Sequence, residues 1–176
     1  SSISSCLGLG QLLLTERRIS EAVSTFRQAV DIKQDSSEAW RLLASAQIEA
    51  GQTAEAVASL GKCLELDPRD SSAAFSFGIL LRNQGNLEQA IAFFQRALQN
   101  SNHTTACVIA ANLAEVLGDT GQKIEAIKVL NEVLKHFPDF TEGWNNLGTL
   151  YLGLDRFDEA TAAYKKCRAL SPDNMI

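Results

Sequence analysis

The amino-acid sequence predicts an all-α fold built from repeated antiparallel helix pairs. Three observations support this prediction: one dipeptide returns at a nearly constant interval, apolar residues recur with helical spacing, and glycine or proline falls at fixed places between them. The dipeptide is Glu-Ala or Gln-Ala, and its alanines are Ala22, Ala56, Ala90, Ala126 and Ala160. They lie 34, 34, 36 and 34 residues apart, so five units of one period cover nearly all of the 176 residues.

The period divides the chain into five predicted units, which are residues 3–36, 37–70, 71–104, 107–140 and 141–174. Thr105 and Ala106 form a two-residue insertion between the third and fourth units. We expect the stretch around this insertion, residues 100–106, to be the longest loop. The chain is interpreted as one domain, residues 1–176, and as a fragment of a longer protein because it begins with Ser1 instead of methionine.

The first half of each unit has the pattern of a helix with one apolar face. Apolar residues recur at the i, i+3, i+4, i+7 spacing that places side chains on one side of a helix. One position in this pattern is always small, and it holds Gly10, Ala44, Gly78, Ala114 and Gly148. A small residue there allows the two helices of a pair to approach closely.

The second half of each unit has a similar stripe, which begins at the dipeptide alanine. A large residue follows four positions later: Phe26, Leu60, Phe94, Leu130 and Tyr164. The turn between the halves carries glycine in three units, where a left-handed backbone can end the first helix, and Arg17 or Asp155 in the outer two. Pro68, Pro138 and Pro172 are expected to end second helices, because proline cannot continue a helix.

The fifth unit shows most closely which family the chain resembles. It reads Trp144, Leu147, Gly148 and Tyr151, followed by Ala160, Tyr164 and Pro172. This pattern and the 34-residue period are similar to those of the tetratricopeptide repeat family. The resemblance implies an α-solenoid in which helix pairs stack into a right-handed superhelix. It also implies that the first helices line a concave face, which binds an extended peptide or a partner helix.

The resemblance carries candidate partner-binding residues onto the first helices. These are Arg41, Ser45, Phe75, Ile79, Arg82, Asn112, Glu115, Asn145, Asn146 and Thr149. The asparagine amides offer both a donor and an acceptor to a peptide backbone. The cations of the family's carboxylate clamp for chaperone tails are missing. Only Asn112 and Asn146 match the asparagine ladder of protein O-linked N-acetylglucosamine transferases, which leaves that relationship open.

Composition and charge exclude several other functions. A net charge of -5 and a pI of about 5.1 disfavour nucleic acid and anionic membranes as partners. The four cysteines form no CxxC pair, and Cys63 and Cys167 fall where the repeat needs small buried residues. His103 and His136 lack the spacing of metal ligands, so we expect no metal and no cofactor. Asn102 begins a glycosylation sequon that is predicted to lie on the surface.

The sequence thus predicts a non-catalytic protein-interaction scaffold that binds a protein or peptide ligand, and we expect it to be cytoplasmic. The alternative is the substrate-recruiting arm of a larger enzyme, similar to O-linked N-acetylglucosamine transferase. End-to-end self-association is a further expectation, because Tyr164 and Leu170 in the last helix have no following repeat to cover them.

Overall fold

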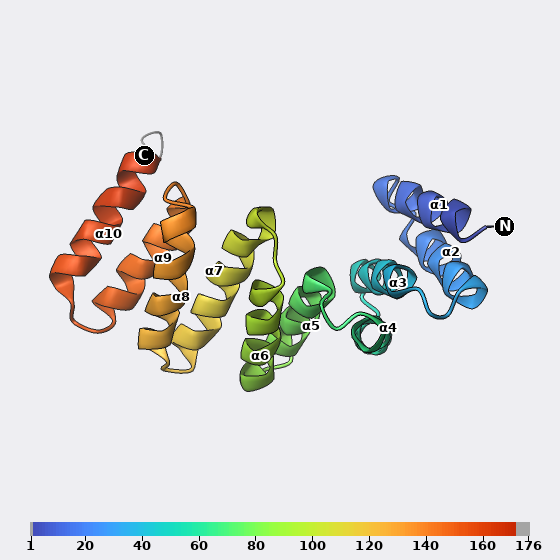
Figure 1. The fold of residues 1–176 in the computed structure, drawn as a ribbon, viewed down its shortest axis with the longest axis horizontal. Coiled ribbons are helices and arrows are strands. Elements are labelled where there is room, and N and C mark those ends of the chain that lie inside the picture. The colour runs from blue at the N-terminus through green and yellow to red at the C-terminus, as the bar shows by residue number, and fades with distance from the viewer. Residues whose placement is uncertain (1, 172–176) are drawn as a thin grey trace. The chain divides into compact units, whose positions relative to one another are not determined.

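The computed structural model describes residues 2–171, apart from the side chains of His103 and Thr104. Within residues 2–171 the backbone forms ten α-helices and no strand (Figure 1). In chain order they are α1 (Ile3–Thr15), α2 (Ile19–Ile32), α3 (Ser37–Glu49), α4 (Thr53–Leu66), α5 (Ser71–Asn83), α6 (Leu87–Gln99), α7 (His103–Asp119), α8 (Lys123–His136), α9 (Thr141–Leu152) and α10 (Phe157–Leu170). The predicted all-α fold class is confirmed.

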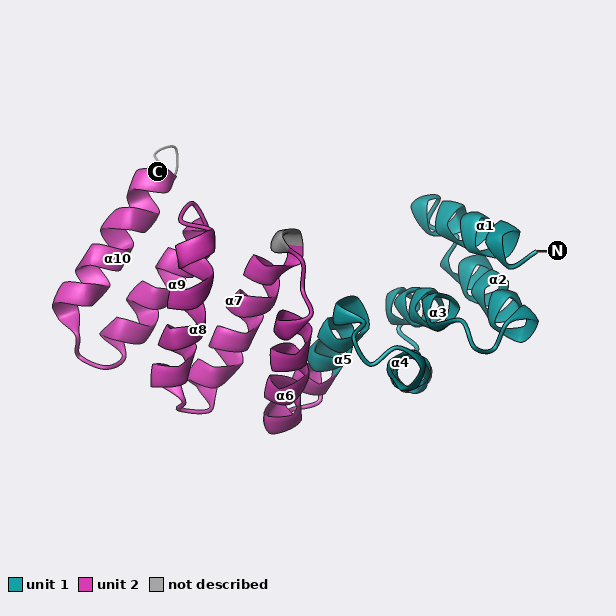
Figure 2. Ribbon diagram, in the orientation of Figure 1, with its two compact units in different colours: residues 1–80 teal, residues 81–176 magenta. Residues whose placement is uncertain are grey.

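The helices form two compact units, residues 1–80 and residues 81–176, and the division falls within α5 (Figure 2). In unit 1, α1 packs on α2, α2 on α3, and α3 on α4. In unit 2, α7 contacts α6, α8 and α9, while α9 also packs on α8 and α10. Each helix therefore buries its apolar stripe against helices that are near it in the chain.

The small and large positions predicted from the repeat meet inside the helix pairs. A Cβ atom added to Gly10 would lie 2.5 Å from Cε1 of Phe26, and one added to Gly148 would lie 2.6 Å from Cε1 of Tyr164. A Cβ atom at Gly10 or Gly148 would therefore overlap the aromatic ring of the second helix, which explains why glycine occupies these two positions. In two other repeats the small residue of the first helix is alanine and the large residue of the second helix is leucine. These are Ala44 with Leu60, and Ala114 with Leu130.

The turns within the helix pairs adopt the predicted left-handed backbone. Positive φ angles occur at Arg17 (61°), Gly51 (73°), Gly85 (79°), Gly121 (80°) and Asp155 (57°). In every one of these turns the next N–H donates to the carbonyl five residues earlier, at 2.7–3.0 Å. This is the hydrogen bond that closes a helix C-terminus in the Schellman motif. The prediction that Arg17 and Asp155 replace the turn glycine is confirmed.

Proline follows two of the second helices, and a tryptophan of the next first helix bonds to the chain after two of them. The helices α4 and α8 end two residues before Pro68 and Pro138, as predicted, whereas Pro172 lies outside the described residues. Trp40 Nε1 donates to the Gln34 carbonyl at 2.9 Å, and Trp144 Nε1 donates to the Pro138 carbonyl at 2.8 Å. Each tryptophan thus ties the first helix of one predicted repeat to the end of the previous one.

The expectation of a long loop at residues 100–106 is wrong. Only residues 100–102 connect α6 to α7, and Thr105 and Ala106 lie within α7, which has 17 residues. The reason is local, because the Asn102 side chain accepts a hydrogen bond from the Thr105 N–H at 3.1 Å and starts the helix early. The insertion therefore lengthens a helix. The division into five repeats with these boundaries stays a prediction.

Candidate functional site

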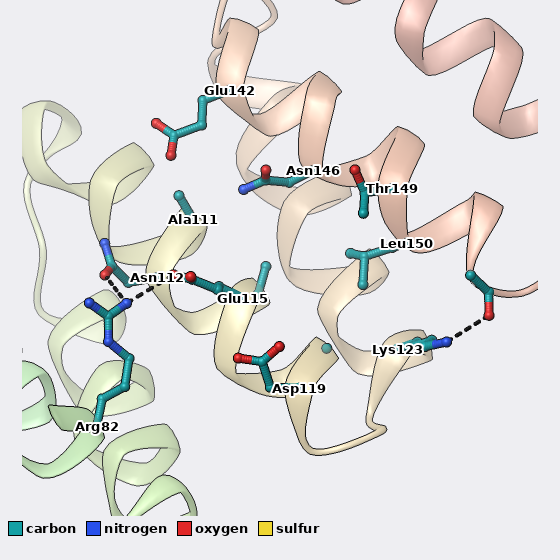
Figure 3. Close-up of a pocket in the computed structure, with 13 residues that line it drawn as sticks. Arg82, Ala111, Asn112, Glu115, Asp119, Lys123, Glu142, Asn146, Thr149 and Leu150 are labelled. Carbon is teal, nitrogen blue, oxygen red and sulfur yellow. Dashed lines mark hydrogen bonds and ion pairs between the residues drawn. The ribbon is translucent and has the colours of Figure 1, made fainter. Parts of the chain in front are cut away.

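Unit 2 contains an open groove between α7 and α9 (Figure 3). Its volume is about 590 Å³. Ligand pockets commonly have volumes of about 300–1,000 Å³, so the groove has an appropriate size. The residues that line it are Arg82, Ala111, Asn112, Ala114, Glu115, Gly118, Asp119, Lys123, Glu142, Asn146, Thr149, Leu150 and Gly153.

Helical spacing places these residues on the two walls. On α7, Ala111, Glu115 and Asp119 follow one another at intervals of four, and α9 has the same spacing at Glu142, Asn146 and Leu150. Residues four apart lie on one face of a helix, one above the other. Each wall is therefore a single helix face that presents a row of side chains along the groove.

Where the two walls meet, the floor of the groove is apolar. Ala111, Ala114 and Leu150 are buried, and Gly118 adjoins them. A Cβ atom added to Gly118 would lie 3.3 Å from Cδ2 of Leu150, which is a tight contact. The alanine and glycine side chains are short, so the space above them remains open where α7 contacts α9.

Arg82, near the end of α5, links to the α7 wall. Its Nη1 donates to Oδ1 of Asn112 and to Oε2 of Glu115, both at 2.9 Å (Figure 3). The Asn112 amide is further fixed, because its Nδ2 donates to the Val108 carbonyl at 2.8 Å. The Arg82 guanidinium therefore neutralises one acid of the groove and holds Asn112 in a defined orientation.

The far end of the groove lies where α7 and α9 end. Lys123, the first residue of α8, donates from Nζ to the carbonyl of Gly153 at 2.7 Å. Asp119 is the last residue of α7 and lies at this end, whereas Glu142 lies at the opposite end (Figure 3). Within residues 2–171, neither Asp119 nor Glu142 forms an ion pair.

The groove collects half of the residues predicted to bind a partner. Arg82, Asn112, Glu115, Asn146 and Thr149 line it, and Thr149 Oγ1 lies 3.1 Å from the Tyr164 hydroxyl. Asn145 is exposed on α9 and does not line the groove. The binding role of all these residues stays a prediction.

The other predicted residues belong to unit 1. Ser45 is exposed, and Phe75 and Ile79 are half-buried. Arg41 already has an acidic partner, because its Nε lies 3.1 Å from Oδ2 of Asp70. A ligand carboxylate would have to compete with Asp70 for this guanidinium.

Sequence reasoning missed Lys123 because it considered only the first helices. A signal was present, since Lys123 is the one charged residue among those that begin the second helices within residues 2–171. The residues in that column are Ile19, Thr53, Leu87, Lys123 and Phe157.

The cysteines and histidines show no catalytic arrangement in the part of the chain that the structure describes. Cys63 is fully buried, and burial together with the nearby Asp70 carboxylate raises its pKa to about 12. Its thiol is therefore held protonated. The burial of Cys63 agrees with the predicted packing role, whereas Cys167 is only half-buried. His136 Nε2 lies 3.8 Å from Oε1 of Glu132, and the side chain of His103 lies outside the described residues. Among the described residues, no group of three or more His, Cys, Asp or Glu could hold a metal ion.

Known families match the whole length of these helices. The sequence model described as the C-terminal ARM domain of tetratricopeptide repeat protein 21 matches residues 3–142, and that of the tetratricopeptide repeat matches residues 141–174. The chain belongs to the tetratricopeptide repeat family. It is therefore a protein-interaction scaffold of the tetratricopeptide type. No helix within residues 2–171 is long and apolar enough to span a bilayer.

Two curated relatives and one solved structure are similar to this tetratricopeptide chain. It is 29% identical over 116 residues to Protein O-mannosyl-transferase Tmtc3 of Drosophila melanogaster, covering 65% of the chain and 12% of that protein. It is 25% identical over 174 residues to the peroxisomal targeting signal receptor of Komagataella phaffii, and this match covers 94% of the chain and 30% of the receptor. The chain thus spans under a third of either relative. The crystal structure of YrrB, a TPR protein with an unusual peptide-binding site, shares the fold with a TM-score of 0.79 at 17% identity. The match covers 97% of this chain and 87% of YrrB.

Proposed function

We propose that this chain is a non-catalytic module that binds an extended peptide in the groove between α7 and α9. The observation that carries the proposal is the groove itself, an open space of about 590 Å³ with an Ala, Gly and Leu floor and polar walls. Small floor residues let a ligand backbone approach, and the Asn112 and Asn146 amides can donate to and accept from that backbone. The description of YrrB as a peptide-binding TPR protein supports the same use of this fold.

The two adjacent asparagines of α9 offer a matched test. Asn146 lines the groove and Asn145 does not, although both are asparagines on the same helix. Asn146→Trp should fill the groove with an indole ring and weaken peptide binding by at least about tenfold, because the ligand is excluded sterically. Asn145→Trp adds the same ring outside the groove and should leave the affinity unchanged.

The probe is a peptide selected from a phage-displayed library of random linear sequences on the wild-type chain. The peptide is then synthesised with a fluorophore and titrated against each variant by fluorescence anisotropy. Far-UV circular dichroism checks that both variants keep their helices. Equal affinity for the wild type and Asn146→Trp would show that peptides bind elsewhere and would refute the groove.

A second candidate function is the recruiting arm of a larger enzyme. The observation that favours it is the match to a protein named as an O-mannosyl-transferase, of which the chain covers 12%. On this proposal the groove would hold the protein substrate while another domain acts on it. Sequencing the full-length gene tests the idea, because it requires a catalytic domain in the same polypeptide.

A further inference from the structure

The helices α3 and α9 each pack on both helices of the pair before them. In unit 1, α3 contacts α1 and α2, and in unit 2, α9 contacts α7 and α8. A Cβ atom added to Gly118 of α7 would lie 3.3 Å from Cδ2 of Leu150 on α9. One added to Gly143 of α9 would lie 3.2 Å from Cδ2 of Leu134 on α8. These two contacts show which positions of the predicted repeat meet when one helix pair stacks on the next.

The helix α1 has the apolar stripe of a first helix, but none of the described residues covers it. Leu9 and Leu12 are 51% and 54% exposed, although α1 packs on its own partner α2. The residues that take these two places of the predicted repeat are at most 9% exposed in α3, α7 and α9. They are Leu43 and Ala46, Leu113 and Val116, and Leu147 and Leu150. The difference reflects the cover that preceding helices provide, so α1 presents an apolar face without this cover.

The last helix pair presents the face that would complete this contact. Leu152, the last residue of α9, is 49% exposed, and Phe157, the first residue of α10, is 60% exposed. Leu152 takes the place of Gly118 in the predicted repeat, and Phe157 takes the place of Lys123. Gly118 and Lys123 both lie against α9, the first helix of the next pair. The first and last helix pairs therefore expose large apolar side chains at positions that the repeat uses for stacking.

A polar pair of residues replaces an apolar pair at the edge of these two faces. In unit 2, Leu134 lies against Gly143. The residues in the same two places of the repeat on the end faces are Arg168 of α10 and Ser5 of α1, which are both exposed. A guanidinium can donate to a serine hydroxyl, whereas a glycine at the place of Ser5 would offer it no side-chain acceptor. The change to polar residues is thus matched on both faces.

We infer that these two faces bind each other, so that the chain associates head to tail with a second copy of itself. Leu12 of one copy packs on Leu152 of the next, and Ser5 packs on Arg168, which continues the stacking within the chain. The contact is heterologous, because the two copies use different faces. A dimer therefore keeps one free face of each kind, to which further copies add. The association is independent of the peptide groove, which none of these four residues lines.

Analytical ultracentrifugation over about 1–100 µM, a range in which weak interfaces dissociate, tests this inference. The wild type should show a mass that rises with concentration beyond that of a dimer. Leu12→Glu and Leu152→Glu each place an unpaired charge against a leucine and should weaken association by at least about tenfold. Both leucines are about half exposed, so the variants should keep their helices, which far-UV circular dichroism checks.

A mixture of the two variants gives the most specific measurement. Each variant keeps one intact face, so the mixture should form a 1:1 dimer that grows no further, because glutamates occupy both remaining faces. The matched control is Ile124→Glu, since Ile124 is 53% exposed on α8 and belongs to neither face. This control should associate as the wild type does.

Four results would overturn the inference. A wild-type chain that stays monomeric over this range would show that the two faces do not bind. A mixture of the variants that stays monomeric would show that other surfaces associate. Association of Leu152→Glu alone would mean that α1 pairs with α1 of the second copy. Dissociation of Ile124→Glu would mean that exposed apolar residues associate without regard to position.

Discussion

Alanine substitution at two glycines of α1 should have different effects on stability. Gly8 is exposed, and apart from its chain neighbours and the backbone of its own helix no heavy atom of the described residues lies within 4 Å of a Cβ atom added there. At Gly10, two residues further on, the added Cβ atom would lie 2.5 Å from Cε1 and 2.6 Å from Cζ of Phe26. The same change of residue thus tests empty space at one site and a packed ring at the other.

The distances set the size of the effect. Ordinary contact begins at 3.4 Å, so the Phe26 ring would have to move by about 0.9 Å, the difference between 3.4 and 2.5 Å. Phe26 is 0% exposed, so its ring cannot move into solvent without neighbouring side chains shifting, and overpacking of this kind costs about 1–3 kcal/mol. Both alanines gain about 1 kcal/mol of helix propensity over glycine. Gly10→Ala should therefore be about 1–3 kcal/mol less stable than Gly8→Ala.

Urea unfolding followed by far-UV circular dichroism measures this difference. A second substitution, Phe26→Leu, should restore the stability of Gly10→Ala, because it reproduces the alanine–leucine combination of Ala44 and Leu60. In the wild-type background Phe26→Leu should destabilise, since it removes a fully buried ring. The coupling between the two sites is expected to be about 1–2 kcal/mol. Equal stability of the two alanine variants would refute the close approach of α1 and α2.

Two further predictions concern the turn at Arg17 and the thiol of Cys63. Arg17→Gly should raise the free energy of unfolding in urea by about 0.5–1 kcal/mol, because Arg17 has φ 61°. Gly51→Ala should lower the free energy of unfolding by about as much, because Gly51 has φ 73°. Cys63 has its pKa raised from 9.0 to about 12, so above pH 9 the unfolded chain releases a proton that the folded chain retains. Its contribution to stability is complete below pH 9 and should fall by at most about 1.4 kcal/mol per pH unit as the pH rises toward 12. Unfolding curves of the wild type and Cys63→Ala should therefore converge over this range, and a constant difference would contradict the raised pKa.

The helices and their turns could be predicted because they depend on local chemistry that recurs in every repeat. Even the irregular turns at Arg17 and Asp155 followed from their place in the period, and both have positive φ. The insertion was the exception. Counting residues suggested a loop at Thr105 and Ala106, but the Asn102 side chain caps the helix at 3.1 Å and draws both residues into α7. A period gives the number of extra residues and says nothing about which element takes them up.

The groove could be predicted only in part, because its shape depends on how α7 and α9 pack. Asn145 and Asn146 are equivalent by residue type, yet consecutive residues in a helix point about 100° apart. Only the contact between the two helices decides which of them faces the groove, and it is Asn146. The same contact buries Leu150 and brings Gly118 within reach of it, so the floor could not be inferred from either helix alone.

The charges of Asp119 and Lys123 at helix ends are only weak evidence in the sequence that these residues line a groove. An acid at the C-terminal end opposes the helix dipole, but Asp119 shares this feature with Glu49 and Glu65 at the ends of α3 and α4. Glu65 is paired with Lys62 at 2.6 Å, whereas Asp119 lines an open groove and has no ion pair among the described residues. Lys123 stands out more clearly, because a cation at the start of a helix is unfavourable and the other second helices begin with neutral residues within residues 2–171. Both departures from favourable helix electrostatics line the same end of the groove, although Asp119 and Lys123 belong to different helices.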